Sequence, residues 1–366
     1  MKPIRVALVG IGNCASSLVQ GIAHYREDGA RAGLISEWVG EYGVGDVEIV
    51  LGIDVDARKV GRDLSEAIFA QPNNTTRFVS ELAPLDAPVI MGRRLDGVAG
   101  HMTGADERGF QPADAPDASQ AAIVDALKGA DVEVLVNFLP VGSHEASEFY
   151  MTCALEAGVA VVNAIPVFIA SDPEWESRFR SRGLPIVGDD IKAQIGATIV
   201  HRMLSQLFAS RGVGVDHTYQ LNTGGNTDFM NMMDRERIGS KKQSKTEAVQ
   251  SALSKKLDAS DIVIGPSEYV PWQKDNKICF LRIEGKQFGD VPMHLEMRLS
   301  VEDSPNAAAC VIDAIRYCRL ARERGEAGAL VAPSAFYCKH PPVQMAEEQA
   351  EKLLATQYGA YPCAAE

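Results

Sequence analysis

The sequence has no long apolar stretch and no grouping of cysteines that would form a disulfide frame or a zinc site. No run of about 18 apolar residues that could cross a bilayer occurs, and no signal-peptide pattern follows Met1. The seven cysteines are scattered along the 366 residues, without a Cys-x-x-Cys pair. This usage is typical of reduced core thiols. We therefore expect a cytoplasmic protein with no membrane partner.

Positive charge is also scarce. Lys and Arg number 36 against 49 Asp and Glu, a formal net charge of −13. Proteins that bind nucleic acid broadly do so through clustered Lys and Arg, so this balance argues against a nucleic-acid partner. An anionic substrate would need a local basic pocket. The length favours two domains, each large enough to bury a core.

The N-terminal residues have the pattern of a dinucleotide-binding turn. A buried-strand pattern over residues 4–9 runs into Gly-Ile-Gly-Asn-Cys-Ala at residues 10–15 and then into a helix-compatible stretch. Gly10 permits a tight turn, Gly12 lets the backbone approach a pyrophosphate, and the small Ala15 lets the helix pack on the strand. Glycine-rich turns of this kind also occur without a nucleotide, so the pattern needs support from elsewhere.

That support comes from the end of the next strand. The apolar run 48–53 ends at Asp54, whose carboxylate could accept hydrogen bonds from ribose hydroxyls, which favours NAD over NADP. The distance from the glycines exceeds the usual spacing of roughly 20 residues. Residues 34–45 must therefore be an insertion between the first helix and the second strand.

Alternating short strands and helices continue the first domain. Apolar runs at 132–138, 159–163 and 186–187 alternate with a helical stretch near 145–157. This order predicts a Rossmann-like, doubly wound parallel sheet. Residues 100–120 are rich in Gly, Pro, Asp and Ala with little periodicity, which predicts an exposed loop.

The pattern changes after about residue 212. Apolar and polar residues alternate over 293–301, and 213–221 and 277–284 also have strand patterns, so we expect an α+β domain with a mainly antiparallel sheet. A partner subunit often covers one face of such a sheet. Helical spacing resumes over 304–324. We therefore divide the chain into an NAD-binding domain (1–197), a catalytic and oligomerisation domain (198–302) and a C-terminal segment that returns to the first domain (303–366).

A dense polar segment lies inside the second domain. Asn-Thr-Gly-Gly-Asn-Thr-Asp at 222–228 is followed by Ser-Lys-Lys-Gln-Ser-Lys-Thr at 240–246. Ser240 and Gln243 have the spacing of a capping box, which would start a helix with Lys241 and Lys245 on one face. Lysines on a first helical turn oppose the helix dipole unless an anion lies among them, so a phosphate site is one interpretation. A solvated basic helix is the other.

Two further carboxylates have similarly open interpretations. Asp189, Asp190 and Lys192 follow a predicted strand end, where open α/β sheets bind ligands. Asp190 could orient a lysine, bind the cofactor or cap a helix. Asp303 precedes the helical stretch at 304–324 and could likewise be a cap or a site residue.

Taken together, these segments resemble one family, the myo-inositol-1-phosphate synthases, particularly the bacterial and archaeal members. The resemblance covers nearly the whole chain, and several long motifs occur in the family's order. They are the glycine turn at 10–14, Gly-Asp-Asp-Ile-Lys at 188–192, Gly-Asn-Thr-Asp at 225–228, the lysine segment at 240–245, Phe-Gly-Asp-Val-Pro at 288–292, Asp-Ser-Pro-Asn at 303–306 and Lys-His-Pro-Pro at 339–342.

The resemblance implies a reaction. Family members hold NAD tightly and recycle it within one turnover. C5 of glucose 6-phosphate is oxidised to a ketone, C6 is enolised and attacks the C1 aldehyde in an intramolecular aldol step, and the ketone is reduced again. It also implies a homotetramer, and a divalent or monovalent cation near the nicotinamide pyrophosphate, although no His/Cys cluster demands a metal.

The resemblance also assigns residues. Four lysines match the family's active-site set, with Asp303 organising them: Lys241 would exchange the C5 hydroxyl proton, Lys245 and Lys277 bind phosphate, and Lys339 attend the attacked carbonyl. Asn226 and Asp228 would orient sugar hydroxyls or lysines. The cofactor would be bound by residues of the glycine turn and of strand ends, namely Gly10, Gly12, Asn13, Cys14, Asp54, Asn137 and Asp190.

One departure bears on the substrate. The family usually has a serine where this chain has Ala193, on the loop that binds phosphate, and Gln194 or Thr198 could compensate. With fructose 6-phosphate the same chemistry would direct C6 onto the C2 ketone and close a five-membered ring. An ordinary NAD dehydrogenase and a non-catalytic NAD sensor are the alternatives from other classes.

Overall fold

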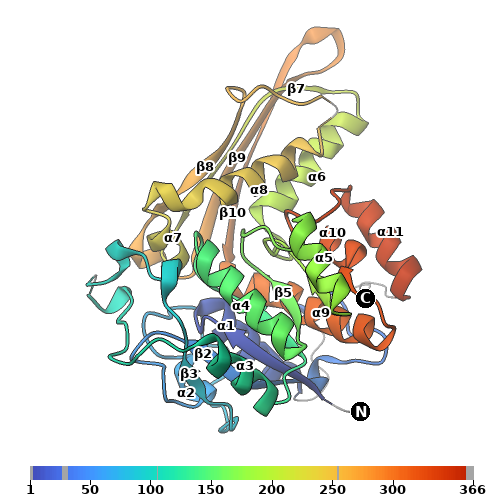
Figure 1. The fold of residues 1–366 in the computed structure, drawn as a ribbon. Helices are drawn as coiled ribbons and strands as arrows, with labels where there is room; N and C mark the ends of the chain where they lie inside the picture. The colour runs from blue at the N-terminus through green and yellow to red at the C-terminus, as the bar shows by residue number, and fades with distance from the viewer. Residues whose placement is uncertain (1–2, 27–31, 105, 254, 360–366) are drawn as a thin grey trace.

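The computed structural model describes residues 3–26, 32–104, 106–253 and 255–359, and it divides into two sheets with their helices (Figure 1). Cys363 and the end of the expected C-terminal segment lie outside the described residues. Where residues are described, none of the helices combines the length and the apolar character that crossing a bilayer requires.

The first sheet is a seven-stranded parallel sheet in the order β11-β6-β5-β4-β1-β2-β3. The chain starts at its centre with β1, builds outward through β2 and β3, and returns to β4 on the other side of β1. Ligands bind in such folds at this reversal of strand order. The strands are β1 (Ile4–Val9), β2 (Val47–Asp54), β3 (Val89–Met91), β4 (Val134–Asn137), β5 (Ala160–Asn163), β6 (Pro185–Val187) and β11 (Gly328–Ala329).

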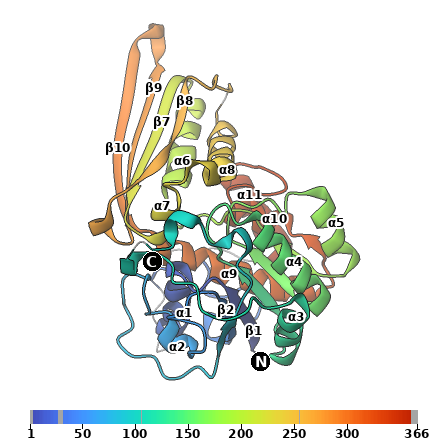
Figure 2. The same ribbon diagram turned by 60° about the vertical axis from the view of Figure 1, so that its left-hand side comes forward.

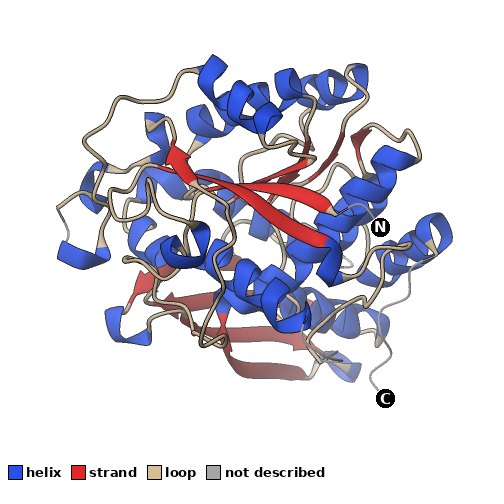
Figure 3. Cartoon of the chain, turned by 90° about the horizontal axis from the view of Figure 1, so that it is seen from below, coloured by secondary structure: helices blue, strands red, loops and turns tan. Residues whose placement is uncertain are grey.

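Helices cover both faces of this sheet, as the view from below shows (Figure 3). On one face α1 (Asn13–Arg26) packs against α9 (Asp303–Glu323). The other face is covered by α3 (Gln120–Gly129), α4 (His144–Ala157) and α5 (Pro173–Ser181). Successive residues of β1 alternate between the two cores, because neighbouring side chains of a strand point to opposite faces. The doubly wound α/β fold is therefore confirmed.

The second sheet has four strands in the order β10-β9-β7-β8 and projects from the body of the molecule (Figure 2). Its strands are β7 (Gly214–Gly224), β8 (Ile262–Tyr269), β9 (Asn276–Lys286) and β10 (Pro292–Glu302). The expectation of a mainly antiparallel sheet holds for β10–β9 and β9–β7, while β8 pairs with β7 in parallel.

One face of the second sheet is covered and the other is open. Two helices, α6 (Ala197–Ser210) and α8 (Gly239–Gln250), pack on the covered face. Apolar side chains on the other face, Leu221, Val263 and Phe280, are more than 40% exposed. This face is where a partner subunit could pack.

The remaining short elements connect these layers. Residues 100–120, expected as an exposed loop, include two short 3-10 helices, and Met102 is fully buried beside Phe110 and Met230. Because Met230 belongs to the second domain, this apolar contact packs the segment against that domain. The other helices are α2 (Leu64–Ala67), α7 (Thr227–Asn231), α10 (Val331–Tyr337) and α11 (Glu347–Tyr358).

Candidate active site

A cavity of about 240 Å³ lies where the carboxyl ends of the parallel strands meet the second domain. Its wall includes the glycine turn at 10–14 and Asp54 on one side and the four motif lysines on the other. Segments more than 200 residues apart in the sequence, such as the glycine turn and Lys339, therefore share one enclosure. This combination is what a reaction between a dinucleotide and an anionic substrate requires.

The glycine turn has the geometry of a phosphate cradle. Gly10 has a φ of +85°, and a Cβ at this position would lie 2.7 Å from the Phe138 carbonyl oxygen. A Cβ on Gly12 would meet nothing within 4 Å, so this glycine leaves open space beside the N-terminus of α1. The backbone amide of Ile11 donates a 2.7 Å hydrogen bond to the carboxylate of Asp54. The residues present therefore fit a dinucleotide.

Asp54 and a lysine that the sequence patterns did not single out complete this side. The second carboxylate oxygen of Asp54 accepts hydrogen bonds from the amides of Val55 and Asp56. Lys59 is buried on the cavity wall, and its Nζ donates to the Ile11 carbonyl over 2.7 Å. Burial lowers the pKa of Lys59. Lys59 therefore stabilises the backbone of the glycine turn through its hydrogen bond to Ile11.

Two predicted cofactor residues take different positions. Cys14 lines the cavity, and its pKa is raised to about 12 by burial and by the charge of Asp275, which keeps the thiol protonated. Asn137 is fully buried outside the cavity wall, where its amide donates to Ser147 and Asn163. The structure does not bring Asn137 into the cavity. Its contacts hold neighbouring strand ends together.

Three of the four lysines lie in ion pairs. Lys339 Nζ lies 2.8 Å from a carboxylate oxygen of Asp190, and Lys277 Nζ lies 3.0 Å from Asp303. Lys241 pairs with Asp228. Burial opposes ionisation of Asp303, but the charge of Lys277 outweighs it and holds the Asp303 pKa below its usual range. Each pair places a fixed cation at the cavity wall.

The fourth lysine differs. Within the part of the chain that the structure describes, Lys245 has no carboxylate at ion-pair distance. Burial and the charges of the other three lysines lower its pKa to about 7. Near neutral pH a large fraction of Lys245 is therefore an uncharged amine. A bound anion would raise its pKa, so that the amine takes up a proton.

The start of α8 differs from the expectation. The helix begins at Gly239 with Ile238 as N-cap and no capping side chain, so the predicted capping box of Ser240 and Gln243 is not formed. The Gln243 amide donates instead to Glu247. A short 3-10 helix at Arg235–Ile238 leads directly into α8, so the helix needs no side-chain cap there.

The loop after β6 contributes part of the predicted phosphate-binding set. Ala193 and Thr198 line the cavity, Thr198 in the first turn of α6. Gln194 does not line it, because its side-chain amide donates to the Gly33 carbonyl over 2.8 Å. Asn226 lies on the wall as the N-cap of α7, accepting from the Phe229 amide.

Neighbouring charged residues of the same motif hold the loop. Asp189 is fully buried and accepts hydrogen bonds from the amides of Ile169, Ala170 and Ser171. Lys192 Nζ lies 3.0 Å from Glu347 of α11. Asp190 is the member of this motif whose carboxylate reaches the lysines.

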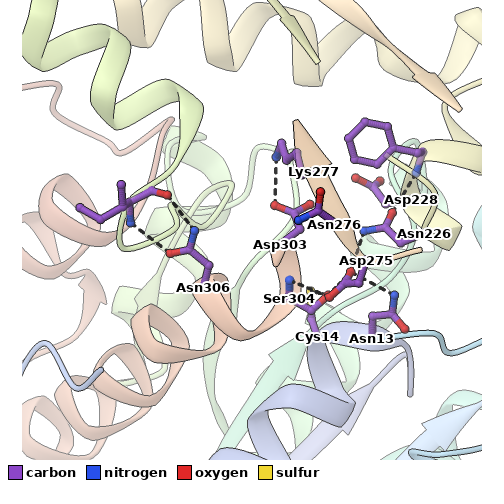
Figure 4. A network of polar contacts seen from close by, with 12 residues as sticks. Asn13, Cys14, Asn226, Asp228, Asp275, Asn276, Lys277, Asp303, Ser304 and Asn306 are labelled. Atoms are coloured by element: carbon purple, nitrogen blue, oxygen red, sulfur yellow. Dashed lines mark hydrogen bonds and ion pairs between the residues drawn. The ribbon is translucent and has the colours of Figure 1, made fainter. Parts of the chain in front are cut away.

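Two neighbours of the cavity were not predicted as site residues, although one of them, Ser244, lies within the lysine segment. Ser244 of α8 donates to Asp190 over 2.7 Å. The buried Asp275 accepts hydrogen bonds from several wall residues, as Figure 4 shows. Both contacts join segments remote in sequence, so no local pattern could reveal them. Among the described residues no group of three or more His, Cys, Asp or Glu side chains is placed to hold a metal.

Comparison with known proteins gives concordant matches. The family model of myo-inositol-1-phosphate synthase matches residues 196–304. Inositol-3-phosphate synthase of Mycolicibacterium smegmatis is 51% identical over 360 residues, which cover 96% of this chain and 97% of that protein. The enzyme of the same name from Corynebacterium glutamicum is 48% identical with the same coverage. A myo-inositol-1-phosphate synthase-related protein of Thermotoga maritima superimposes with a TM-score of 0.82 at 25% identity, covering 98% of this chain and 99% of that chain.

Proposed function

The chain belongs to the myo-inositol-1-phosphate synthase family, and from this premise we propose how it converts glucose 6-phosphate into 1L-myo-inositol 1-phosphate. The observation that carries the proposal is the shared cavity, in which a dinucleotide turn faces four lysines, three of them paired with aspartates. The reaction is an isomerisation, so substrate and product have the same oxidation state overall.

We propose that NAD lies along the glycine turn. The family is NAD-dependent, and Gly10, Gly12 and Asn13 with Asp54 and Asp190 border the space that would hold it. Bound there, NAD would supply a reversible hydride acceptor for C5 of the sugar. The chain's own contribution here is to fix the turn, since Asp54 and Lys59 each hold a backbone group of Ile11.

The lysines supply proton transfer and positive charge. The C5 hydroxyl proton passes through Lys241 to its partner: Lys241 gives one proton to the Asp228 carboxylate and takes the hydroxyl proton, and both transfers reverse when C5 is reduced. The ketone at C5 acidifies the C6 protons, one of which passes to the substrate's own phosphate dianion. The enolate then attacks C1, and the oxygen at C1 takes a proton from Lys339, which the phosphate group restores. In this proposal Lys339, held by Asp190, stabilises the oxygen that becomes negative at the attacked carbonyl. Ammonium groups fixed before the reaction stabilise such charges at little cost in reorganisation.

The phosphate is bound by the remaining lysines. Lys277 is a fixed cation because Asp303 raises its pKa against the effect of burial. Lys245 gains a proton when the phosphate dianion arrives, since the anion offsets the repulsion from the other lysines. Thr198 supplies a hydroxyl group at the start of α6.

Ala193 on the cavity wall favours one alternative substrate. The lost hydroxyl group loosens the phosphate site, and a sugar displaced by about 1 Å can change which carbonyl C6 reaches. Fructose 6-phosphate would then give a five-membered cyclitol phosphate by the same proton transfers.

Assembly, location and a cation complete the proposal. The open apolar face of the second sheet supports a homotetramer, which light scattering after size-exclusion chromatography tests. A divalent or monovalent cation near the nicotinamide pyrophosphate and a cytoplasmic location remain predictions. Dependence of activity on added salts after chelation tests the first, and fractionation of cells the second.

Product analysis tests the reaction. The protein is incubated with NAD and either glucose 6-phosphate or fructose 6-phosphate, free of isomerases, and products are identified by phosphorus and carbon NMR. We expect an inositol phosphate from the glucose ester and no net NADH. A five-membered product from the fructose ester selects the alternative substrate. Stoichiometric NADH indicates a dehydrogenase, and binding without any product indicates a sensor.

A further inference from the structure

Asp275 is a buried carboxylate that lies outside the cavity wall and contacts three segments that form the wall. Only 1% of its surface is exposed. One oxygen accepts hydrogen bonds from the side chains of Asn13 (3.2 Å), Asn226 (2.9 Å) and Ser304 (2.9 Å). The other accepts from the Thr75 hydroxyl (2.7 Å) and the Ser304 amide (3.1 Å). Five donors therefore converge on one carboxylate. Figure 4 shows Asp275 among Asn13, Asn226 and Ser304.

The donors come from different parts of the fold. Asn13 belongs to the glycine turn and is the first residue of α1, Asn226 caps α7 of the second domain, and Ser304 is the second residue of α9. All three line the cavity. Thr75 closes the network, because its amide donates to the Asn13 side chain. Asp275 thus joins the nucleotide side of the cavity to the lysine side.

The backbone of the same residue holds a catalytic ion pair. The Asp275 carbonyl accepts a 3.0 Å hydrogen bond from the Asp303 amide. Lys277, two residues further along β9, pairs with the Asp303 side chain. A change at Asp275 is therefore transmitted to the Lys277–Asp303 pair and to the glycine turn together.

We propose that Asp275 is a positioning residue that couples NAD binding at the glycine turn to the placement of the lysines that bind the sugar phosphate. The inference rests on the proposed function for the identity of the substrate. The predicted effect on NAD binding does not depend on that identity. Burial and the nearby charge of Asp303 raise the Asp275 pKa to about 6, so the carboxylate is still ionised at neutral pH. An ionised acceptor surrounded by donors fixes all of them in one orientation.

The variant Asp275→Asn tests the role because asparagine has the same shape but cannot accept at both ends. If its oxygen faces Asn13 and Asn226, its amide group faces the Ser304 N–H. In the opposite orientation the introduced NH2 group faces the side-chain NH2 groups of Asn13 and Asn226, so donor meets donor. Neither of these can rotate freely, since the oxygen of Asn13 accepts from Asn74 and Thr75 and that of Asn226 accepts from Phe229.

Two further variants complete the test. Thr75→Val keeps the inference testable if Asp275→Asn does not fold, and Asp216→Asn is the matched control. Thr75→Val removes one donor to Asp275, together with the contact between the Thr75 hydroxyl and Ser17, at a residue that does not line the cavity. Asp216→Asn changes an exposed aspartate near the other end of β7, where its partner is Lys286. Each variant is assayed for thermal unfolding, for NAD affinity by calorimetry, and for kcat and KM with glucose 6-phosphate.

We expect Asp275→Asn to weaken NAD binding and lower kcat by about 10- to 100-fold, the effect of losing a hydrogen bond to a charged group. Thr75→Val lowers the NAD affinity and kcat by a smaller factor, and Asp216→Asn leaves the NAD affinity and kcat unchanged. The double variant Asp275→Asn/Thr75→Val is no worse than Asp275→Asn alone, because Thr75 acts through the carboxylate.

The outcomes separate the inference from the proposed function. Folded Asp275→Asn and Thr75→Val proteins with wild-type NAD affinity overturn the coupling, as does a fully additive double variant. A lowered melting temperature with unchanged NAD affinity and kcat indicates a merely structural role and also overturns it. If the wild-type protein makes no inositol phosphate, the proposed function fails, and NAD affinity still decides the role of Asp275.

Discussion

Lys339 Nζ lies 2.8 Å from the Asp190 carboxylate, so a residue from the C-terminal segment is fixed by a loop of the parallel sheet. The other oxygen of Asp190 accepts a 2.7 Å hydrogen bond from Ser244 of α8. Burial disfavours the charge on Asp190, but Lys339 and Lys241 outweigh it and hold the Asp190 pKa below its usual range. Asp190 thus connects three segments at the cavity and holds the side chain of Lys339 in position.

Replacement of Asp190 by Asn should release Lys339. The lysine loses its counter-charge, and we expect kcat to fall by about 100-fold, the lower part of the range for losing a positioned acid or base. Ser244→Ala is the matched control, because it removes a contact to Asp190 but leaves the ion pair intact. Steady-state kinetics with glucose 6-phosphate provides the measurement. A kcat near wild type in Asp190→Asn would show that this pair has no part in turnover.

Lys241→Ala and Lys339→Ala should abolish turnover while NAD stays bound, because the two amines pair with Asp228 and Asp190 and the glycine turn is held by other residues, Asp54 and Lys59. Lys242→Ala is the control, since Lys242 is an exposed neighbour on α8. The assays are inositol phosphate formation and NAD titration of each purified variant. Wild-type activity in either cavity variant refutes the assignment of the active site.

Phosphate affinity should depend on the protonation of Lys245. Its pKa of about 7 means that the ammonium form, which the anion needs, is lost as the pH rises above 7. Affinity for inorganic phosphate should therefore fall with increasing pH, at a limiting slope of about tenfold per pH unit. Lys245→Met should bind phosphate more weakly and lose most of this slope. Calorimetry between pH 7 and 9 measures how the phosphate affinity changes with pH. The same pH dependence in the wild-type protein and in Lys245→Met contradicts the role of Lys245.

Local sequence patterns predicted much of the architecture. The apolar runs of β1, β2 and β10 and the glycine turn have short-range periodicity, so their positions followed from the residues alone. Motif resemblance placed the four lysines, and the structure brings all of them to one cavity. The parallel pairing of β8 with β7 has no local signature, because register depends on contacts across the sheet.

Side-chain partners were predicted less well. Asn137 ends β4 and Gln194 lies in the loop after β6, and both were expected at the ligand site, yet each makes internal hydrogen bonds instead. Asp275 joins partners as far away as Asn13, so nothing around it in the sequence indicates a role. The low pKa of Lys245 likewise depends on charges carried by other elements.

Ala193→Ser should strengthen substrate binding. The residue lies on the cavity wall beside the first turn of α6, and a hydroxyl there adds one donor to the phosphate. We expect KM for glucose 6-phosphate to fall severalfold, since one such hydrogen bond contributes about 1 kcal/mol. Ala197→Ser, also on the wall, tests whether any added hydroxyl has the same effect. An unchanged KM in Ala193→Ser contradicts the phosphate role of this loop.

The two glycines of the turn should fail in different ways when replaced by alanine. Gly10→Ala places a Cβ 2.7 Å from the Phe138 carbonyl oxygen at a positive φ, which should lower the free energy of unfolding by about 1–3 kcal/mol. Gly12→Ala meets nothing within 4 Å, so stability should stay unchanged while the new methyl group blocks the pyrophosphate. Urea unfolding without NAD separates the two effects, because bound NAD would itself stabilise the fold. A Gly12→Ala protein with wild-type NAD affinity would show that the dinucleotide does not approach this turn.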